Sequence, residues 1–216
     1  MIDFLVTTMP FLFDGLMITI AVSGLVVASS LVTGILCGVG LVYGPLWVRL
    51  PIRAYSDILR GTPLLVLIFL IIYGLPIVGV NFGNFASAVV ALAAFKTAHV
   101  AEIVRGAVQS IHAGQTDAAK AIGLTFRQRL QYVILPQAIR RFLPPWINSV
   151  TDAVKGSALV SLVGIVDLML AVQQVIGRTY DPLPMYLLGA AMYVAINYSL
   201  SQASRRLEVR FAYIRE

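Results

Sequence analysis

Three stretches without Asp, Glu, Lys or Arg constrain this chain most: residues 15–48, 61–95 and 182–204, which contain 34, 35 and 23 residues. A helix needs about 20 mostly apolar residues to cross a bilayer. Of the 216 residues, 59% are hydrophobic and 12% are charged, whereas soluble domains have about 45–50% and about 25%. A soluble chain of this size could not bury so much apolar surface in one core. The sequence therefore predicts an all-α, polytopic membrane protein and argues against a soluble enzyme.

Breaks rich in glycine and proline divide these stretches, so we expect five spans within a single transmembrane domain covering residues 1–216. The spans are expected at residues 16–43, 62–76, 85–108, 143–177 and 185–204. The fourth is too long for one simple helix and contains charged residues, so we expect it to be broken. The acidic start, Met1-Ile2-Asp3-Phe4, and the long first apolar run predict a retained span instead of a cleaved signal peptide.

The distribution of basic residues predicts the orientation. Thirteen of the 16 Lys and Arg residues lie in the first and third loops and in the C-terminal tail. Only Arg178 lies in a loop on the other side, and Lys96 and Lys155 lie within spans. Because cytoplasmic loops carry the excess of Lys and Arg, the N-terminus is predicted outside and the C-terminus in the cytoplasm. The thirteen are Arg49, Arg53, Arg60, Arg105, Lys120, Arg127, Arg129, Arg140, Arg141, Arg205, Arg206, Arg210 and Arg215.

One extramembrane segment is long, the cytoplasmic loop at residues 109–142, and loops of that size are usually functional or structured. A short helix is predicted at its centre, with Thr116 as N-cap, Asp117 at the positive end of the helix dipole and Gly123 as the stop. Ala118 and Ala119 leave this helix almost without bulk. A helix so short is unstable alone, so we expect it to dock on another subunit or on this protein's own cytoplasmic face. A second, amphipathic piece at residues 126–134 is expected to end before Pro136.

The same loop contains a spaced pattern that resembles the EAA loop of binding-protein-dependent ABC importer permeases. Asp117-Ala118-Ala119 is followed after three residues by Gly123, and after nine more by Val133-Ile134-Leu135-Pro136. The family pattern has Glu at the place of Asp117 and Ile at the place of Val133. Further matches to the polar amino acid branch are the sequences at 59–65, 101–106, 112–115, 135–138 and 159–162, and the resemblance extends over residues 15–210.

This resemblance implies a permease subunit of an ATP-driven importer for a polar amino acid or close analogue, in the bacterial cytoplasmic (inner) membrane. It implies two cytoplasmic ABC ATPase subunits that use ATP and Mg, a second permease chain (identical or a sister protein) and an external solute-binding protein, besides membrane lipid. Thr116, Asp117, Ala118, Ala119, Gly123 and Pro136 are the residues it assigns to ATPase coupling. No Gly-x-x-x-x-Gly-Lys-Ser/Thr loop is present, so ATP hydrolysis is expected on a separate subunit and the chain is predicted not to be an enzyme.

Charged residues within the spans are candidates for the substrate path or a gate, because each is costly in lipid. Glu102 either pairs with Arg105 or forms a gate or substrate contact, and Asp152 and Lys155 either pair with each other or meet the ammonium and carboxylate of a zwitterionic ligand. Where the family has an aromatic residue this chain has His99, which is expected to be a hydrogen-bonded helix residue or, alternatively, a ligand contact. Lys155-Gly156-Ser157 likewise departs from the family's Lys-Asp/Asn-Thr. Lys96 can be explained by snorkelling.

Other functions have less support from the sequence. One cysteine, Cys37, and two histidines argue against a metal site, no cofactor is expected on the chain itself, and the scattered basic residues do not indicate nucleic-acid binding. A permease for methionine or a quaternary amine remains the nearest alternative. An ion-coupled secondary transporter is less well supported because no inverted repeat is apparent, and a membrane-embedded hydrolase has no evident nucleophile and base.

Overall fold

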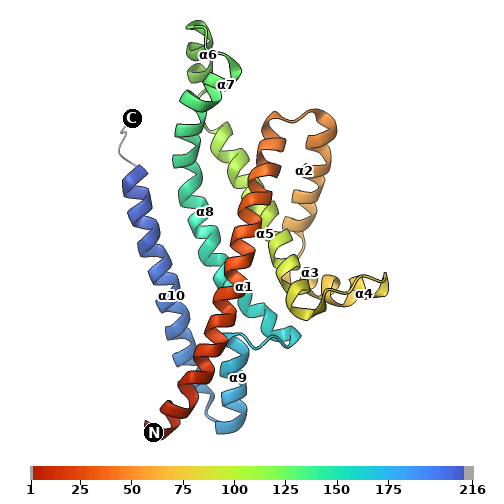
Figure 1. The fold of residues 1–216 in the computed structure, drawn as a ribbon, viewed down its shortest axis with the longest axis vertical. Coiled ribbons are helices and arrows are strands. Elements are labelled where there is room, and N and C mark those ends of the chain that lie inside the picture. Colours follow the sequence, from red (N-terminus) through yellow and green to blue (C-terminus); the bar gives the residue numbers. More distant parts are fainter. Residues whose placement is uncertain (1, 212–216) are drawn as a thin grey trace.

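The computed structural model describes residues 2–211, with side chains described for residues 8–203 and 206, so Met1, Tyr213 and Arg215 lie outside it. Helices and short connections make up the described residues, which contain no strand (Figure 1). The α-helices are α1 (Ile2–Tyr43), α2 (Leu46–Gly61), α3 (Leu64–Phe69), α4 (Leu75–Ile77), α5 (Gly83–Gln109), α6 (Ala113–Ala121), α7 (Phe126–Arg129), α8 (Leu135–Ser157), α9 (Leu168–Thr179) and α10 (Pro182–Phe211). Two π-helical turns, η1 (Leu70–Gly74) and η2 (Leu130–Ile134), and a 3-10 helix, η3 (Ala158–Val163), connect some of them.

Three helices of the described chain are long and apolar enough to cross a membrane singly: residues 8–43, 83–109 and 182–203. Two bent pairs would raise the number of spans to five if each pair crosses once. One pair joins α2 to residues 64–77 at 109°, and the other joins residues 126–163 to α9 at 51°. The second bend lies at Gly164, whose φ of +80° is accessible to glycine at little cost. It falls within residues 143–177, the segment in which the sequence predicts a break.

Residues 46–61, which the sequence analysis treats as part of a loop, instead form helix α2. Pro45 starts this helix in an extended conformation, and Thr62, extended because Pro63 follows, ends it. Its amphipathic sequence allows it to pack along α5, where the Tyr55 hydroxyl donates to the Ala94 carbonyl at 2.6 Å. After Thr62 the chain turns into a lateral arm, residues 64–77, that projects sideways from the bundle (Figure 1).

The centre of the bundle is the contact between α1 and α5, which depends on two glycines of α1. A Cβ at Gly34 would lie 2.5 Å from the Val100 Cβ, and one at Gly38 would lie 2.5 Å from the Val104 Cβ. Glycines four residues apart allow two transmembrane helices to approach closely. The Thr33 and Thr97 hydroxyls share a hydrogen bond of 2.6 Å in the same contact.

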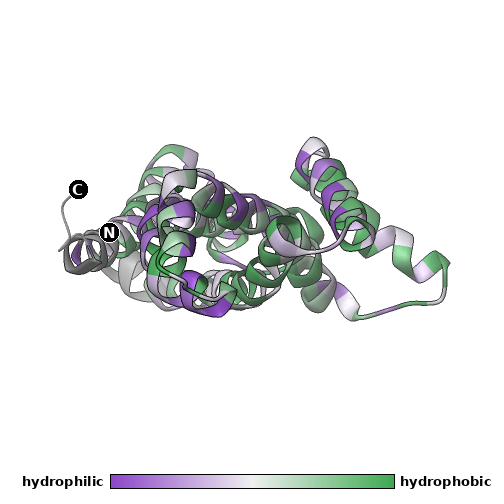
Figure 2. Cartoon of the chain, turned by 90° about the horizontal axis from the view of Figure 1, so that it is seen from above, coloured by the Kyte–Doolittle hydropathy of each residue, from purple (hydrophilic) through white to green (hydrophobic). Residues whose placement is uncertain are grey.

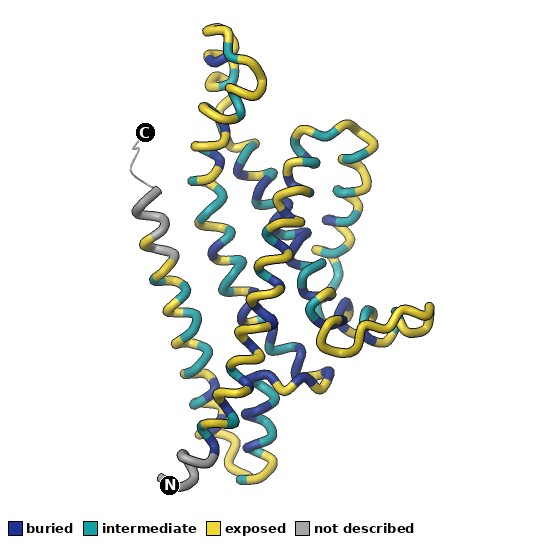
Figure 3. The backbone as a smooth tube through the Cα atoms, viewed as in Figure 1, coloured by how far each residue is buried: buried dark blue, intermediate teal, exposed yellow. Residues whose placement is uncertain are grey.

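An apolar cluster joins α1, α9 and α10 at the opposite end of the molecule from α6. Leu12, Leu168 and Val172 are its most buried large side chains. Elsewhere the apolar surface faces outward: Figure 2 shows hydrophobic residues all along the bundle, and Figure 3 shows that α10 and the outer side of α1 are largely exposed. Exposed apolar surface of this extent marks contact with a membrane or with another protein.

Candidate functional site

The helix in the long loop, α6, lies at one tip of the molecule (Figure 1), and its start is four residues earlier than the sequence predicts. His112, and not Thr116, is its N-cap: the His112 Nδ1 accepts from the Gly114 backbone N–H at 3.1 Å. Thr116 lies inside the helix, where an N-cap role is impossible. His112 is not evident as a cap from the sequence, because the usual capping residues are Ser, Thr, Asp and Asn.

The end of α6 is set by Gly123. Its φ is +81°, its backbone N–H donates to the Lys120 carbonyl at 2.9 Å, and the N–H of Leu124 donates to the Ala119 carbonyl at 3.0 Å. These two bonds form a Schellman motif, which satisfies carbonyls that the last turn would leave unpaired. A left-handed residue is required at this point, and glycine adopts that conformation without a Cβ penalty.

Most of the surface of α6 is free of contact with the rest of the described chain. Ala119 is its one buried residue, while Asp117 and Ala118 are exposed (Figure 3). Ile122, which follows the helix, is 77% exposed. Asp117 forms an ion pair with Lys120 at 3.0 Å, which lies on the surface. The helix therefore presents small residues and one surface ion pair, followed by the apolar Ile122, to whatever approaches this end of the molecule.

The base of α6 is tied to α8 through α7 and η2. Arg129 Nη1 donates to the Leu124 carbonyl at 2.9 Å, and Phe126 packs edge-on against Tyr43 of α1 with ring centroids 5.5 Å apart. The helix does not end before Pro136, contrary to the expectation from the sequence, because η2 is a π-helical turn. Such a turn widens the backbone where proline would otherwise remove a hydrogen bond and clash with the preceding turn. A nearly continuous helix therefore leads from α7 to the middle of the molecule.

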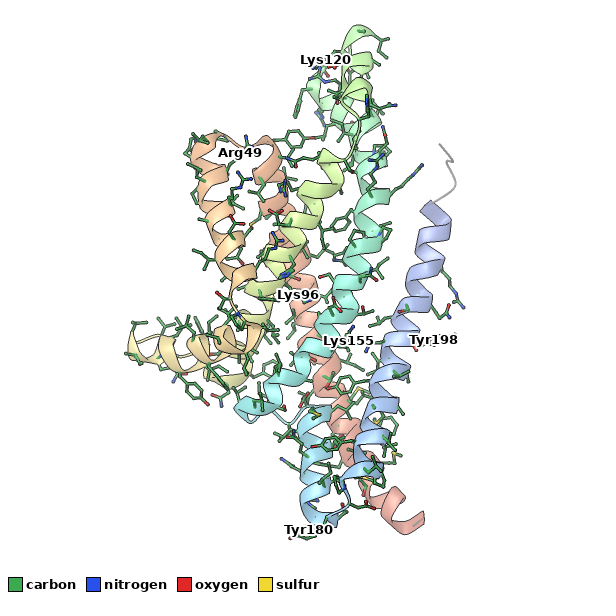
Figure 4. All side chains as sticks on the ribbon, turned by 180° about the vertical axis from the view of Figure 1, so that it is seen from behind. Arg49, Lys96, Lys120, Lys155, Tyr180 and Tyr198 are labelled. Carbon is green, nitrogen blue, oxygen red and sulfur yellow. The ribbon has the colours of Figure 1, made fainter. Side chains whose placement is uncertain are left out.

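Charged side chains in the spans gather on facing parts of α5 and α8. Lys96, His99 and Glu102 are spaced three residues apart along α5, so they follow one side of that helix. Asp152 and Lys155 lie on α8, which packs against α5. Figure 4 shows Lys96 and Lys155 near the middle of the long axis, away from Arg49 and Lys120 at the α6 end. We call Lys96, His99, Asp152 and Lys155 the central charged face.

The two ion pairs foreseen in the sequence are both formed, but in different surroundings. Glu102 Oε2 accepts from Arg105 Nη2 at 2.6 Å and from its Nε at 2.9 Å, and Arg60 Nη1 of α2 lies 3.7 Å away. This carboxylate is therefore held by two guanidinium groups. Asp152 Oδ1 lies 2.9 Å from Lys155 Nζ, and the two side chains are 59% and 61% exposed.

His99 is a hydrogen-bonded helix residue in the structure. Its Nδ1 donates to the Phe95 carbonyl at 2.9 Å, and its ring lies against that of Phe95 with centroids 4.5 Å apart. Among the described side chains no group of three or more His, Cys, Asp or Glu residues could hold a metal ion.

Asp167, to which the sequence analysis gave no role, is fully buried between α1, α9 and α10. Its Oδ1 caps α9 by accepting from the Leu170 N–H at 3.0 Å, and its Oδ2 accepts from the Tyr193 hydroxyl at 3.3 Å. The signal that could have found it is an Asp directly before an apolar helical run.

Comparison with known proteins agrees with this architecture. Residues 30–213 match the family described as the binding-protein-dependent transport system inner membrane component. The chain belongs to this family. The permease is 36% identical over 205 residues to the "Probable glutamine ABC transporter permease protein GlnP" of Bacillus subtilis, with 93% of each chain covered. It is 35% identical over 204 residues to the glutamine transport system permease protein GlnP of Escherichia coli, again with 93% of each covered.

Solved structures support the same fold for the permease. A crystal structure of an amino acid ABC transporter with histidines matches with a TM-score of 0.89 and 33% identity, covering 95% of this chain and 96% of the other. A chain of the MetNI methionine ABC transporter matches with a TM-score of 0.78 at 23% identity, which speaks for the fold alone. The permease is thus an inner-membrane component of a transport system, and ATP hydrolysis in such a system resides on a separate subunit.

Proposed function

We propose that this permease moves a polar amino acid or a close analogue inward across the membrane, with its N-terminus outside and its C-terminus in the cytoplasm. Relatives at 35% and 36% identity carry glutamine in their names. The orientation is supported by the gathering of loop cations toward the α6 end, where Arg49 and Lys120 lie (Figure 4).

The observation that carries the substrate class is the exposed ion pair of Asp152 and Lys155 near the C-terminal end of α8, at about the middle of the molecule (Figure 4). Each charge would cost at least about 2.5–3.5 kcal/mol at the centre of a lipid-facing helix. An exposed pair at this depth is therefore expected to face a wet path inside the assembled transporter. A carboxylate and an ammonium side by side complement the ammonium and carboxylate of an amino acid. The Glu102 group, closer to the α6 end and clamped by Arg60 and Arg105, is proposed as a gate.

The partners are proposed from the surfaces that the described chain leaves exposed. α6, exposed and nearly free of bulk, docks on one of two cytoplasmic ATPase subunits, which bind ATP and Mg; this chain itself holds no cofactor. The apolar lateral arm, with Ile77 85% exposed, contacts a second permease chain, identical or a sister protein, or lipid. An external solute-binding protein delivers the substrate. Thr116, Asp117, Ala118, Ala119, Gly123 and Pro136 are the proposed coupling residues.

The proposed mechanism uses the helical connection between α6 and the central charged face. Closure of the ATPases moves α6, and the bond from Arg129 to the Leu124 carbonyl transmits this movement to α7 and η2. Because α7, η2 and α8 form one helical segment over residues 126–163, a tilt at its base displaces Asp152 and Lys155. Alternating exposure of the central charged face then follows from a rigid-body movement.

The test is uptake into proteoliposomes that contain the permease with its ATPase, its sister permease if there is one, and its binding protein. We expect ATP-dependent accumulation of a labelled polar amino acid, and none with an ATPase variant that cannot hydrolyse ATP. Methionine and a quaternary amine serve as competitors. Accumulation of either in preference to every polar amino acid would contradict the proposed substrate class, and uptake without ATP would contradict the importer assignment.

A further inference from the structure

The central charged face contains one cation, Lys96, that belongs to neither of the two ion pairs. Its side chain is buried, with 8% of the residue exposed, and none of the ion pairs formed by described acids includes it. Asp152 is paired with Lys155, and Glu102 with Arg105 and Arg60. Asp167, the one fully buried acid among the described side chains, accepts from Leu170 and Tyr193 near the other end of the molecule.

Snorkelling does not explain Lys96. It is the middle residue of α5, which covers Gly83–Gln109, so 13 residues separate it from either end. At 1.5 Å per residue that is about 20 Å, several times the reach of a lysine side chain. A lysine that cannot reach the membrane surface carries its charge only with a partner in the protein or its path, because burying an unpaired charge is costly.

The surroundings of Lys96 point to the same wet path as the ion pair. Lys96 interacts electrostatically with both Asp152 and Lys155 across the contact between α5 and α8. His99, one turn further along α5, interacts with Lys96, Asp152 and Arg60. Figure 4 shows the labelled Lys96 and Lys155 at neighbouring levels of the molecule. With Lys96 charged, the central charged face therefore contains one buried ammonium group, one exposed ammonium group and one exposed carboxylate, a net charge of +1 while His99 is neutral.

We infer that Lys96 binds a second carboxylate of the substrate, so that the transported solute is an acidic, dicarboxylic amino acid. This inference rests on the proposed function. In the complex Asp152 receives the substrate ammonium, while Lys96 and Lys155 each receive one carboxylate. The three protein charges (+, −, +) match the three charges of such an amino acid (−, +, −), and the net charges of +1 and −1 cancel. The exposed Asp152–Lys155 pair can exchange partners readily, because exposed ion pairs contribute little stability.

Specificity depends on whether the side chain of the substrate carries a carboxylate. Glutamine has an uncharged amide where glutamate has a carboxylate, so glutamine leaves one buried ammonium without a counter-charge. Arginine places a third positive charge beside Lys96 and Lys155. A difference in affinity arises from such unpaired and like charges as much as from good contacts. The order of affinity is therefore glutamate, then glutamine, then arginine.

The test is direct binding of labelled L-glutamate, L-glutamine and L-arginine to the purified permease–ATPase complex in detergent, without the external binding protein. We expect wild type to bind glutamate about tenfold or more tightly than glutamine. Lys96→Gln removes that preference by weakening glutamate alone, and Lys96→Arg keeps it. Arg178→Gln, at an exposed cation distant from the face, changes neither affinity. Asp152→Asn weakens both amino acids together.

Two results would overturn the inference, and they are distinguishable. If wild type binds glutamine as tightly as glutamate, or if Lys96→Gln weakens both equally, Lys96 does not recognise a second carboxylate, but the permease still handles polar amino acids. If wild type binds none of the three while it binds methionine or a quaternary amine, the proposed function itself is wrong. The comparison of glutamate with glutamine in wild type needs no variant and so is independent of folding defects.

Discussion

At the scale of single residues, exposure separates the two ion pairs that share the same i, i+3 spacing. The Glu102 side chain is 18% exposed and is held by two guanidinium groups, whereas Asp152 and Lys155 are 59% and 61% exposed. The spacing alone predicts both pairs equally well. Exposure in the folded chain, which a sequence does not give, is the reason that we propose the second pair for the ligand contact.

A double-mutant cycle tests that distinction. If Asp152 and Lys155 only neutralise each other, Asp152→Asn with Lys155→Gln should restore uptake, because each single change strands a charge and the double change strands none. If both contact the substrate, as we propose, the double variant transports no better than the worse single variant. The measurement is uptake at equal abundance in the membrane, with co-purification of the ATPase as control for assembly. Recovery of uptake in the double variant would leave a structural pair only.

At the scale of elements, α6 and its Schellman turn are the proposed point at which an ATPase subunit moves the spans. Gly123→Leu places a Cβ on a residue with φ of +81°, although no heavy atom lies within 4 Å of that Cβ. The penalty is therefore conformational and not steric. We expect this variant to hydrolyse ATP in the assembled complex but to transport little.

Gly123→Asn is the matched control, because asparagine tolerates the left-handed conformation better than other residues do. It should retain most transport, and both variants should insert into the membrane. Wild-type uptake together with wild-type co-purification of the ATPase in Gly123→Leu would contradict the docking assignment of α6.

The contact between α1 and α5 makes a second prediction at this scale. Gly34→Ala puts a Cβ 2.5 Å from the Val100 Cβ, whereas Gly24→Ala, on the same helix, meets nothing within 4 Å. We expect Gly34→Ala to destabilise the permease by roughly 1–3 kcal/mol, the usual cost of overpacking, and Gly24→Ala to be neutral. Thermal unfolding of the purified complex measures the difference. Equal midpoints for the two variants would show that α1 and α5 separate without cost.

The elements also show what sequence reasoning can and cannot reach. Prediction from the lengths of the uncharged stretches found the long apolar helices, because the thickness of the bilayer sets the length of a span. It missed α2, whose Arg49, Arg53 and Arg60 resemble loop cations until the helix folds back along α5. It also misplaced the start of α6, since a histidine cap is unusual, and the end of the helix at Pro136, since a π-helical turn has no strong sequence signal. The glycine spacing at Gly34 and Gly38 was readable but was not used.

At the scale of the whole molecule, the bundle separates charged groups from a buried apolar cluster along one axis. Loop cations and α6 lie toward one end, the apolar cluster of α1, α9 and α10 lies toward the other, and the central charged face lies between them (Figures 1 and 4). The sequence could supply the charges of that face, but not which helices bring them together, because Lys96 and Lys155 are 59 positions apart. The sequence also allowed Lys96 to be explained by snorkelling, because its burial is evident only in the packed bundle.

Single-cysteine labelling tests the orientation of this axis. In a Cys37→Ser background, cysteines in the 81–84 loop should react with an impermeant reagent added outside intact cells, because the positive loops are expected in the cytoplasm. A cysteine at Gln128 should react only after the membrane is opened. Asp3 and Tyr213, predicted outside and inside respectively, lie beyond the described side chains and can be tested in the same way. Labelling at position 128 from outside would reverse the topology.

We propose that the exposed part of α8 lines a water-filled path and not lipid. The most direct test is the reactivity of Lys155→Cys in the assembled transporter toward a small hydrophilic thiol reagent, in the Cys37→Ser background. Val194→Cys is the matched control, because Val194 is 65% exposed on the apolar helix α10. We predict that position 155 reacts, that substrate protects it, and that position 194 does not react. If position 155 is as unreactive as position 194, Asp152 and Lys155 face no aqueous path, which would contradict the proposed substrate site.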